Sequence, residues 1–285
     1  MSTTNSLQRA GRSLAPLLAR IFLRRPFVKP LALLEAYLAF IQGKGSGGGW
    51  DMEAEARVAS SFIHRPDAVV FDVGAHHGEW SRWLLRLLGT DSQCQVFQFE
   101  PLKYNLSVLH SLNLPRTTIV EAAVSDTPGT AVLYALDMQS PVALRDPLAA
   151  WSHVPSLHRR REAQLQRYDF VEEQVKVVTI DDTMESFGID SVDFMKLDVE
   201  GSELAVLRGS RQALQTKRIK ALTFEFGCGN INSRTYFHDF WDLLKGYGYT
   251  IQRICPGGIL LEITEYYEDL EYFRGVTNYL ATAQS

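Results

Sequence analysis

Three carboxylates in this chain stand where an apolar run gives way to a turn. Asp72 lies near the end of one run, Glu100 ends a second, and Asp198 ends a third and is soon followed by Glu200. In an open α/β sheet, ligands bind where strands end and helix N-termini begin. The pattern therefore predicts one nucleotide-like ligand and one reaction centre at a single edge of a sheet.

The turn after Asp72 differs from the glycine-rich turn that binds dinucleotides. That turn requires G-x-G-x-x-G, but His76 and Glu79 stand where the second and third glycines belong. Without the second glycine the backbone cannot approach a pyrophosphate, which argues against NAD. An acidic strand end suits a ligand with a positive ammonium or sulfonium group, and S-adenosylmethionine is such a ligand. Glu100 follows the turn by about 20 residues, the spacing of a ribose-binding carboxylate.

We therefore predict a binding site for S-adenosylmethionine at the ends of these strands. The carboxylate of Glu100 accepts hydrogen bonds from the ribose hydroxyls, and Ala123 and Val124 flank the adenine. Core packing is an equally good interpretation of those two apolar residues. The predicted cofactor-binding residues are Asp72, Gly74, Ala75, His76, Gly78, Ser81, Glu100, Ala123, Val124 and Asp198.

Asp198 and Glu200 are the predicted catalytic residues. Asp198 ends its strand beside the expected position of the transferred methyl group, and Glu200 lies on the turn that follows. An alcohol is a poor nucleophile, so methyl transfer to it benefits from a carboxylate that takes the proton. Glu203 is interpreted instead as stabilising a helix N-terminus. A divalent metal held by Asp198, Glu200 and Glu225 is an alternative way to acidify the alcohol, but spacing alone does not show that they converge, and no metal ligand is predicted.

Strand and helix patterns alternate along most of the chain, which predicts a mostly parallel sheet with helices on both faces. Residues 137–173 break this alternation and contain three prolines. A connection of that length is typical of a lid or binding loop. The expected strands are 68–73, 95–100, 117–124, 130–136, 175–180, 192–197, 221–226, 249–254 and 278–282, and the expected helices are 52–64, 79–88, 102–112, 202–214 and 235–245.

The first 50 residues differ from the rest in charge. They carry seven Lys and Arg side chains against one carboxylate, Glu35, and residues 44–49 are rich in glycine, as in a linker. This predicts a basic helical extension with a linker at 1–50 and a catalytic domain at 51–285. Residues 14–23 are expected to form a short helix, either packed on the domain or in peripheral contact with an anionic membrane.

Composition limits the remaining function classes. The formal net charge is −4 despite the basic extension, so a broad basic surface for nucleic acid is not expected. The cysteines, Cys94, Cys228 and Cys255, are widely spaced and odd in number, which favours a reducing compartment. We expect a cytoplasmic protein, with the inner membrane surface as the place of any peripheral contact.

Three blocks of sequence resemble the FkbM-type methyltransferases. They are Val70–Ala75 with Gly78, Phe99-Glu100-Pro101, and Lys196–Glu203 followed by Leu207 and Gly209; Thr179–Asp182 and Asn278–Ala281 fit as well. The resemblance spans roughly residues 60–282, and its third block is the most specific. It implies a Rossmann-like class I fold with seven strands and an antiparallel last strand. It also implies S-adenosylmethionine as methyl donor and a hydroxyl acceptor on a sugar, glycolipid or polyketide-like molecule. His76 departs from the asparagine usual there.

Two other functions remain as alternatives. One is a nucleotide-dependent oxidoreductase, against which the broken glycine pattern argues. The other is a non-catalytic protein that keeps the cofactor fold for interaction, against which the presence of Asp198 and Glu200 argues. The expected partner is a small-molecule or glycan acceptor. The acceptor's identity and the oligomeric state do not follow from the sequence.

Overall fold

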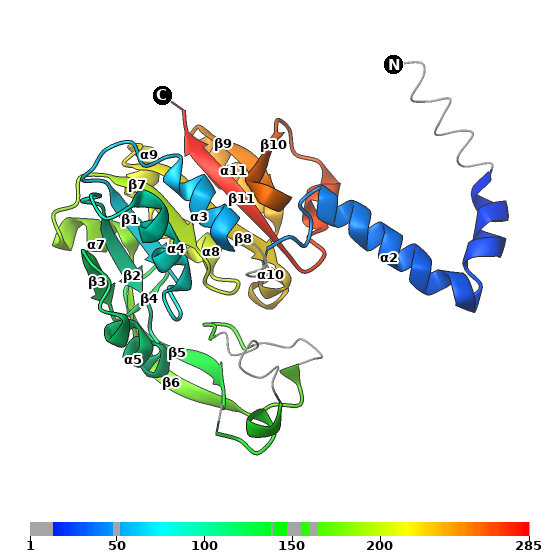
Figure 1. Ribbon diagram of the computed structural model, residues 1–285, viewed down its shortest axis with the longest axis horizontal. Helices are drawn as coiled ribbons and strands as arrows, with labels where there is room; N and C mark the ends of the chain where they lie inside the picture. Colours follow the sequence, from blue (N-terminus) through cyan, green and yellow to red (C-terminus); the bar gives the residue numbers. More distant parts are fainter. Residues whose placement is uncertain (1–13, 48–51, 138, 147–154, 160–164, 285) are drawn as a thin grey trace.

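The computed structural model describes residues 14–47, 52–137, 139–146, 155–159 and 165–284. Its main sheet has the strand order β10-β9-β11-β8-β7-β1-β2-β3. The strands are β1 (Val69–Val73), β2 (Gln95–Phe99), β3 (Thr117–Val120), β7 (Val192–Leu197), β8 (Ile219–Gly227), β9 (Tyr249–Cys255), β10 (Ile259–Ile263) and β11 (Val276–Ala283). β3, β2, β1, β7 and β8 run parallel, and β11 lies antiparallel between β8 and β9 (Figure 1).

This order confirms the predicted Rossmann-like sheet with an antiparallel last strand. β10 is an addition that the sequence analysis does not contain, and it pairs with β9 as a hairpin at the edge. The expected strand 117–124 is interrupted at Glu121 and Ala122. Its first part stays in the main sheet as β3, while β4 (Ala123–Val124) joins a second sheet with β6 (Phe170–Val178) and β5 (Gly129–Leu136).

Helices cover both faces of the main sheet because the strand residues alternate between two apolar layers. On one face, α3 (Met52–Ser60) and α4 (Glu79–Leu88) pack with Val70 and Phe194. On the other face lie α7 (Ile180–Ser186), α8 (Glu203–Arg208), α9 (Arg211–Gln215) and α11 (Phe237–Gly246). Two further α-helices of the described chain are α5 (Lys103–Leu112), beside the start of α4, and α10 (Cys228–Ser233), after β8.

Two helical segments differ from expectation for local reasons. The expected strand 175–180 ends at Val178, because Thr179 caps α7 by accepting a hydrogen bond from the Asp182 amide at 3.0 Å. The expected helix 202–214 is divided into α8 and α9 at Gly209. A Cβ on Gly209 would lie 2.1 Å from the carbonyl oxygen of Ser125, so only glycine fits where the chain passes that backbone.

The insertion is partly built into the second sheet. β5 and β6 pair antiparallel from Gly129↔Val177 to Leu136↔Phe170, so β6 begins inside the expected insertion 137–173. This hairpin extends below the main sheet in Figure 1. Ser156 pairs with Tyr134 of β5 and thereby brings residues 155–157 back toward the main sheet. Residues 138, 147–154 and 160–164 of the insertion lie outside the described part of the chain.

The N-terminal arm, defined here as residues 14–41, is longer than the short helix expected. Residues 14–22 are helical, and after a bend at 23–24 the chain continues as α2 (Arg25–Ile41), which projects away from the domain (Figure 1). In the described part of the chain, no helix combines the length and apolar character needed to cross a membrane.

The expected glycine linker is packed rather than free over its first half. The Gly45 amide donates to Thr277 Oγ1 at 3.1 Å, and the Gly47 amide donates to the Val276 carbonyl at 2.9 Å. A Cβ on Gly45 would lie 2.3 Å from the Arg274 carbonyl oxygen. These glycines therefore allow close approach to β11 instead of providing flexibility, and residues 48–51 lie outside the described chain.

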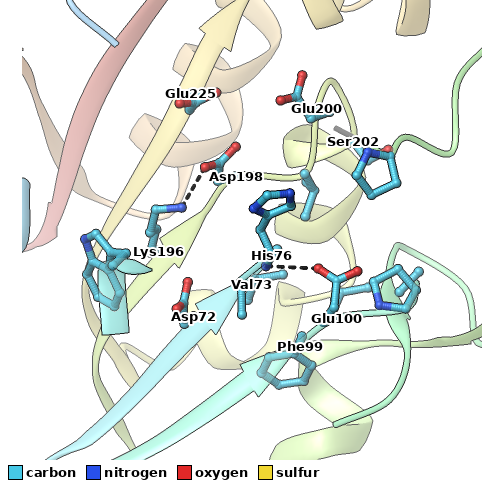
Figure 2. Close-up of a pocket in the computed structure, with 18 of the residues that line it drawn as sticks. Asp72, Val73, His76, Phe99, Glu100, Lys196, Asp198, Glu200, Ser202 and Glu225 are labelled. Carbon is cyan, nitrogen blue, oxygen red and sulfur yellow. Dashed lines mark hydrogen bonds and ion pairs between the residues drawn. The ribbon is translucent and has the colours of Figure 1, made fainter. Parts of the chain in front are cut away.

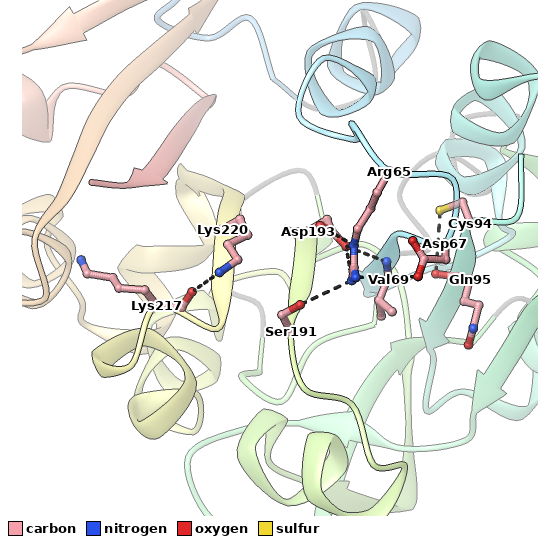
Figure 3. A network of polar contacts seen from close by, with 9 residues as sticks. All are labelled: Arg65, Asp67, Val69, Cys94, Gln95, Ser191, Asp193, Lys217 and Lys220. Atoms are coloured by element: carbon pink, nitrogen blue, oxygen red, sulfur yellow. Dashed lines mark hydrogen bonds and ion pairs between the residues drawn. The ribbon is translucent and has the colours of Figure 1, made fainter. Parts of the chain in front are cut away.

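A polar network fixes the opposite, amino-terminal edge of the parallel strands. Asp193 at the start of β7 accepts hydrogen bonds from the Arg65 guanidinium at 3.0 Å and from the Val69 amide at 2.8 Å (Figure 3). It thereby ties the first residues of β1 and β7 together. Because the register of these two strands is set at this edge, their carboxyl ends are held level at the other edge, where the predicted site lies.

Candidate active site

The turns after β1 and β7 approach each other more closely than any side chain would allow. Gly74 has φ +86°, and a Cβ there would lie 1.8 Å from the carbonyl oxygen of Asp198. The amides of Gly74 and Ala75 both donate to the Phe99 carbonyl at 3.0 Å. This geometry requires a residue without a side chain at position 74. As a result, the ends of β1, β2 and β7 meet at one point.

Asp72 is fully buried beneath that point. Its Oδ2 accepts a hydrogen bond from Ser81 Oγ at 2.5 Å, and its Oδ1 has no partner among the described residues. Burial raises the pKa of the Asp72 carboxyl, while the charge of Lys196 opposes that rise. An unpartnered carboxylate oxygen that faces a cavity is a ready acceptor for a ligand's cationic or N–H group.

Glu100 immediately follows β2 and is also buried. Its Oε2 accepts from the His76 amide and its Oε1 accepts from the Leu102 amide, both at 2.9 Å (Figure 2). Burial raises the pKa of Glu100 to about 7, although these backbone hydrogen bonds act in the opposite direction. The two amides orient the carboxylate toward the cavity. The carboxylate has four lone pairs, so it can still accept from a ligand hydroxyl beside these amides and the Asn105 side chain, which also acts on its pKa.

Lys196 is the main site residue that the sequence analysis did not single out. It lies two residues before Asp198 on β7 and opposite Asp72 in the register of β1, so the three side chains share one face. Its ammonium donates to Asp198 Oδ2 at 2.7 Å (Figure 2). Burial would lower the pKa of Lys196, but the charges of Asp198 and Asp72 outweigh it and the net direction is upward. The sequence signal that could have identified Lys196 as a site residue is its place at the start of the Lys196–Glu203 block.

Glu225 at the end of β8 adds a further carboxyl to this group. Figure 2 shows it beyond Asp198 on the same side of the sheet. Burial raises its pKa well above the ordinary value, and the charges of Asp198 and Glu200 add to that rise. One buried cation, Lys196, is therefore shared among several carboxyls.

The turn after β7 separates the roles of its two glutamates. Glu200 has φ +54°, and its carbonyl accepts from Ser156 Oγ of the insertion at 2.9 Å. Glu203 is 1% exposed and accepts from the amides of Val199 and Gly201 at 3.0 Å. Burial raises the pKa of Glu203 to about 8. Glu203 thus shapes the turn through the amides that precede α8, whereas Glu200 lines the cavity.

A cavity of about 630 Å³ lies at this edge of the sheet and contains most of the predicted site. Gly78 and Ser81 are not in its lining: Gly78 packs near Leu109 and Leu112 at the start of α4, and Ser81 holds Asp72 from behind. The predicted residues that line the cavity are Asp72, Gly74, Ala75, His76, Glu100, Ala123, Val124, Asp198 and Glu200.

The insertion and two helices complete the walls, and one of these helices is α3, which contributes Met52 and Glu55. Residues 155–157 line the cavity, which places part of the expected lid at the site. From α4 come Glu79, Arg82, Trp83 and Arg86, which share one side of the helix by their spacing. The Arg86 guanidinium lies 4.8 Å from the centre of the Trp83 ring. Among the described residues, no group of three or more His, Cys, Asp or Glu side chains is arranged to hold a metal ion.

A family model and a curated relative both match this chain. A family model described as "Methyltransferase FkbM domain" matches residues 72–251, more than half of the chain. A curated relative from Sinorhizobium fredii (strain NBRC 101917 / NGR234), "2-O-methyltransferase NoeI", is 27% identical over 165 residues. That match covers 55% of this chain and 63% of the relative, so it spans less than two thirds of the relative's length.

Solved structures of methyltransferases are also similar. The FkbM methyltransferase of Methylobacillus flagellatus KT superposes with a TM-score of 0.46 at 18% identity, over 78% of this chain and 47% of that one. The plantazolicin methyltransferase BamL, solved with a triazolic desmethylPZN analog and SAH, superposes with a TM-score of 0.45 at 8% identity, over 99% of each chain.

Proposed function

Because this chain belongs to the FkbM methyltransferase family, we propose that it transfers a methyl group from S-adenosylmethionine to a hydroxyl oxygen of a sugar-bearing acceptor. The family assignment makes the protein a methyltransferase and sets aside both alternatives, the oxidoreductase and the non-catalytic protein. Beyond the family, we propose the identity of the methyl donor and of the acceptor atom.

The observation that carries the proposal is the distribution of carboxylates in the cavity. Glu100 lies to one side in Figure 2, and the apolar residues Ala123 and Val124 line the same cavity, as an adenosine group would require. Asp72 and Asp198 lie to the other side in Figure 2, and Asp72 Oδ1 has no partner among the described residues. S-adenosylmethionine carries ribose hydroxyls at one end and ammonium and sulfonium charges at the other. The residues present therefore fit this ligand, with Glu100 for the ribose and Asp72 for the cationic end.

The chain's own residues supply proton transfer and positioning. S-adenosylmethionine, when bound, supplies an electrophilic methyl group. Asp198 Oδ2 is held by Lys196, which leaves Oδ1 to accept the proton of an acceptor hydroxyl. Glu200 is the second candidate for this role, on the turn next to Asp198. Residues 155–157 of the insertion line the same cavity and form one wall beside these charges.

The α4 wall of the cavity supports a sugar-bearing acceptor. Trp83 offers an aromatic face against which the apolar side of a sugar ring can pack, and Arg82 and Arg86 offer hydrogen-bond donors for its oxygens or for an anionic substituent. The name of the relative NoeI refers to a 2-O-methyltransferase. Glycans, glycolipids and polyketide-like products with hydroxyl groups are the acceptor classes to test.

Mass spectrometry tests the proposal directly. Extracted metabolites and glycolipids are incubated with S-adenosylmethionine and the protein, and compared with samples that lack the protein. We expect the gain of one methyl group on a sugar hydroxyl, located by fragmentation, and loss of the product when Trp83 is replaced by Ala. A methyl group found on nitrogen, or a product unaffected by Trp83→Ala, would overturn the acceptor assignment without touching the family.

Affinity for S-adenosylhomocysteine should depend on pH through Glu100. The pKa of this carboxyl is raised to about 7, so it is protonated below that pH and ionised above it. If the ribose hydroxyls donate to the ionised form, affinity falls by about tenfold for each pH unit below 7 and levels off above it. Calorimetry between about pH 6 and pH 8 measures this. Glu100→Gln should bind more weakly and with a flat profile; a profile that persists in that variant would assign the titration to another group, such as Glu203, whose pKa burial raises to about 8.

A further inference from the structure

The N-terminal arm presents apolar side chains to solvent along its whole length. Of residues 14–38, all are exposed except Ala19 and Ala36. The exposed large apolar residues there include Leu23 at 65%, Leu33 at 70% and Tyr37 at 63%. A helix that is apolar on all sides is normally buried in protein or lipid. A continuous exposed apolar surface of this kind marks an interaction site.

Basic residues gather at the far end of the same arm. Arg20, Arg24, Arg25 and Lys29 surround the bend between the two helices, where the rings of Phe22 and Phe27 lie 6.0 Å apart. None of these four cations makes an ion pair with another residue of the described chain. The arm's one carboxylate in this region, Glu35, is 2.8 Å from Arg274 of the domain. The distal part of the arm therefore has no negative charge of its own.

The base of the arm is held firmly against the domain. Besides the Glu35–Arg274 ion pair, Arg274 donates to the Ala32 carbonyl at 3.2 Å, and the Tyr272 hydroxyl donates to Glu35 at 2.6 Å. Further along, the Arg253 guanidinium donates to the Gln42 carbonyl at 3.1 Å. The base also adjoins the active site, since Val276, which binds the Gly47 amide, lines the cavity. The arm is thus anchored at one end and projects from the domain at the other (Figure 1).

We propose that the N-terminal arm docks this protein on the surface of an anionic lipid bilayer. Its apolar side chains insert among the acyl chains below the headgroups, and Arg20, Arg24, Arg25 and Lys29 bind lipid phosphates. Charge complementarity favours an anionic bilayer over a second copy of the chain as the partner of the arm. The arm of a second copy brings the same four cations, and its Glu35 is already paired with Arg274.

Vesicle co-sedimentation of the full chain tests the proposal. The probes are phosphatidylcholine vesicles with and without phosphatidylglycerol, at low and high salt. We expect binding to the anionic vesicles that weakens as salt rises, because surface charges are screened. Arg24→Ser with Arg25→Ser should weaken that binding at least tenfold. Leu33→Glu with Leu34→Glu should abolish it. Ile259→Glu, at an equally exposed apolar residue on the edge strand β10, is the matched control and should bind as the wild type does.

The results distinguish docking of the arm on lipid from docking on a second copy of the chain. Sedimentation equilibrium without lipid reports the oligomeric state of the wild type and of the Leu33→Glu, Leu34→Glu variant. A monomer that binds anionic vesicles through both sets of residues supports the proposal. Failure of the wild type to sediment with anionic vesicles overturns it, as does binding that the Leu33→Glu, Leu34→Glu variant retains. A stable dimer that this variant dissociates, without vesicle binding, would assign the arm to self-association.

Discussion

Replacement of Asp198 by Asn is expected to lower the turnover of methyl transfer by about 10²–10⁴-fold. The substitution keeps the size and shape of the side chain but removes the charge that accepts the hydroxyl proton. The amide oxygen of the introduced asparagine can still accept a hydrogen bond from Lys196, so the local geometry should persist. Turnover measured at saturating donor and acceptor, together with the calorimetric affinity for S-adenosylhomocysteine, checks the prediction. Affinity should change by less than about tenfold, since Asp72 and Glu100 remain.

Two further variants show whether Asp198 is the base that accepts the proton. Glu200→Gln removes the neighbouring carboxylate of the same turn, and Asp67→Asn removes an exposed carboxylate at the opposite edge of the sheet. If affinity for S-adenosylhomocysteine drops in step with turnover in Asp198→Asn, then Asp198 positions the donor and is not the base. If turnover is retained in that variant and lost in Glu200→Gln, the proton goes to Glu200. The Asp67 variant should match the wild type in both measurements.

The sequence was sufficient to predict the sheet edge and most of the site because strand ends are local signals. An apolar run followed by a glycine turn identifies where a strand stops, and parallel strands bring their carboxyl ends to one edge. Asp72, Glu100 and Asp198 meet there for that reason. The predicted antiparallel last strand also followed, through the family resemblance, and is β11 in the structure.

Properties that depend on contacts between distant segments were not predictable from local patterns. The glycines of residues 43–47 have the composition of a linker, yet they pack against β9 and β11. The need for glycine at position 209, between α8 and α9, depends on the backbone of Ser125, more than 80 residues earlier in the chain. Ser81 was predicted to bind the cofactor, but its hydroxyl donates to Asp72. In each case the local sequence does not reveal which partner decides the geometry.

Lys196 illustrates the same limit at the centre of the site. The sequence does not show which carboxylates neutralise a lysine inside an apolar strand. The structure places it opposite Asp72, in contact with Asp198, and near Glu225. Its positive charge lowers the pKa of both Asp72 and Glu225. We therefore assign Lys196 as the residue that neutralises the buried carboxyls, and we expect its removal to destabilise the fold.

Replacement of Lys196 by Met is expected to lower the free energy of unfolding by about 3–5 kcal/mol, because it leaves buried carboxyls without their cation. The loss should depend on pH. Without Lys196 the pKa values of Asp72 and Glu225 rise further, so the folded state keeps protons that the unfolded state releases. Stability then falls as pH rises above the ordinary carboxyl pKa, and the deficit relative to wild type is larger at about pH 8 than at about pH 5. Urea unfolding at the two pH values measures it.

A matched control and a double-mutant cycle decide whether the cause is electrostatic. Lys220→Met removes an exposed lysine of β8 and should change stability by less than about 0.5 kcal/mol. In the background of Asp198→Asn one of the carboxylates is already neutral, so Lys196→Met should cost less than it does in the wild type. An equal cost in both backgrounds, or a deficit that does not grow with pH, would show that Lys196 acts through its packing. In that case the carboxyls of the cavity are protonated in the folded protein and need no cation.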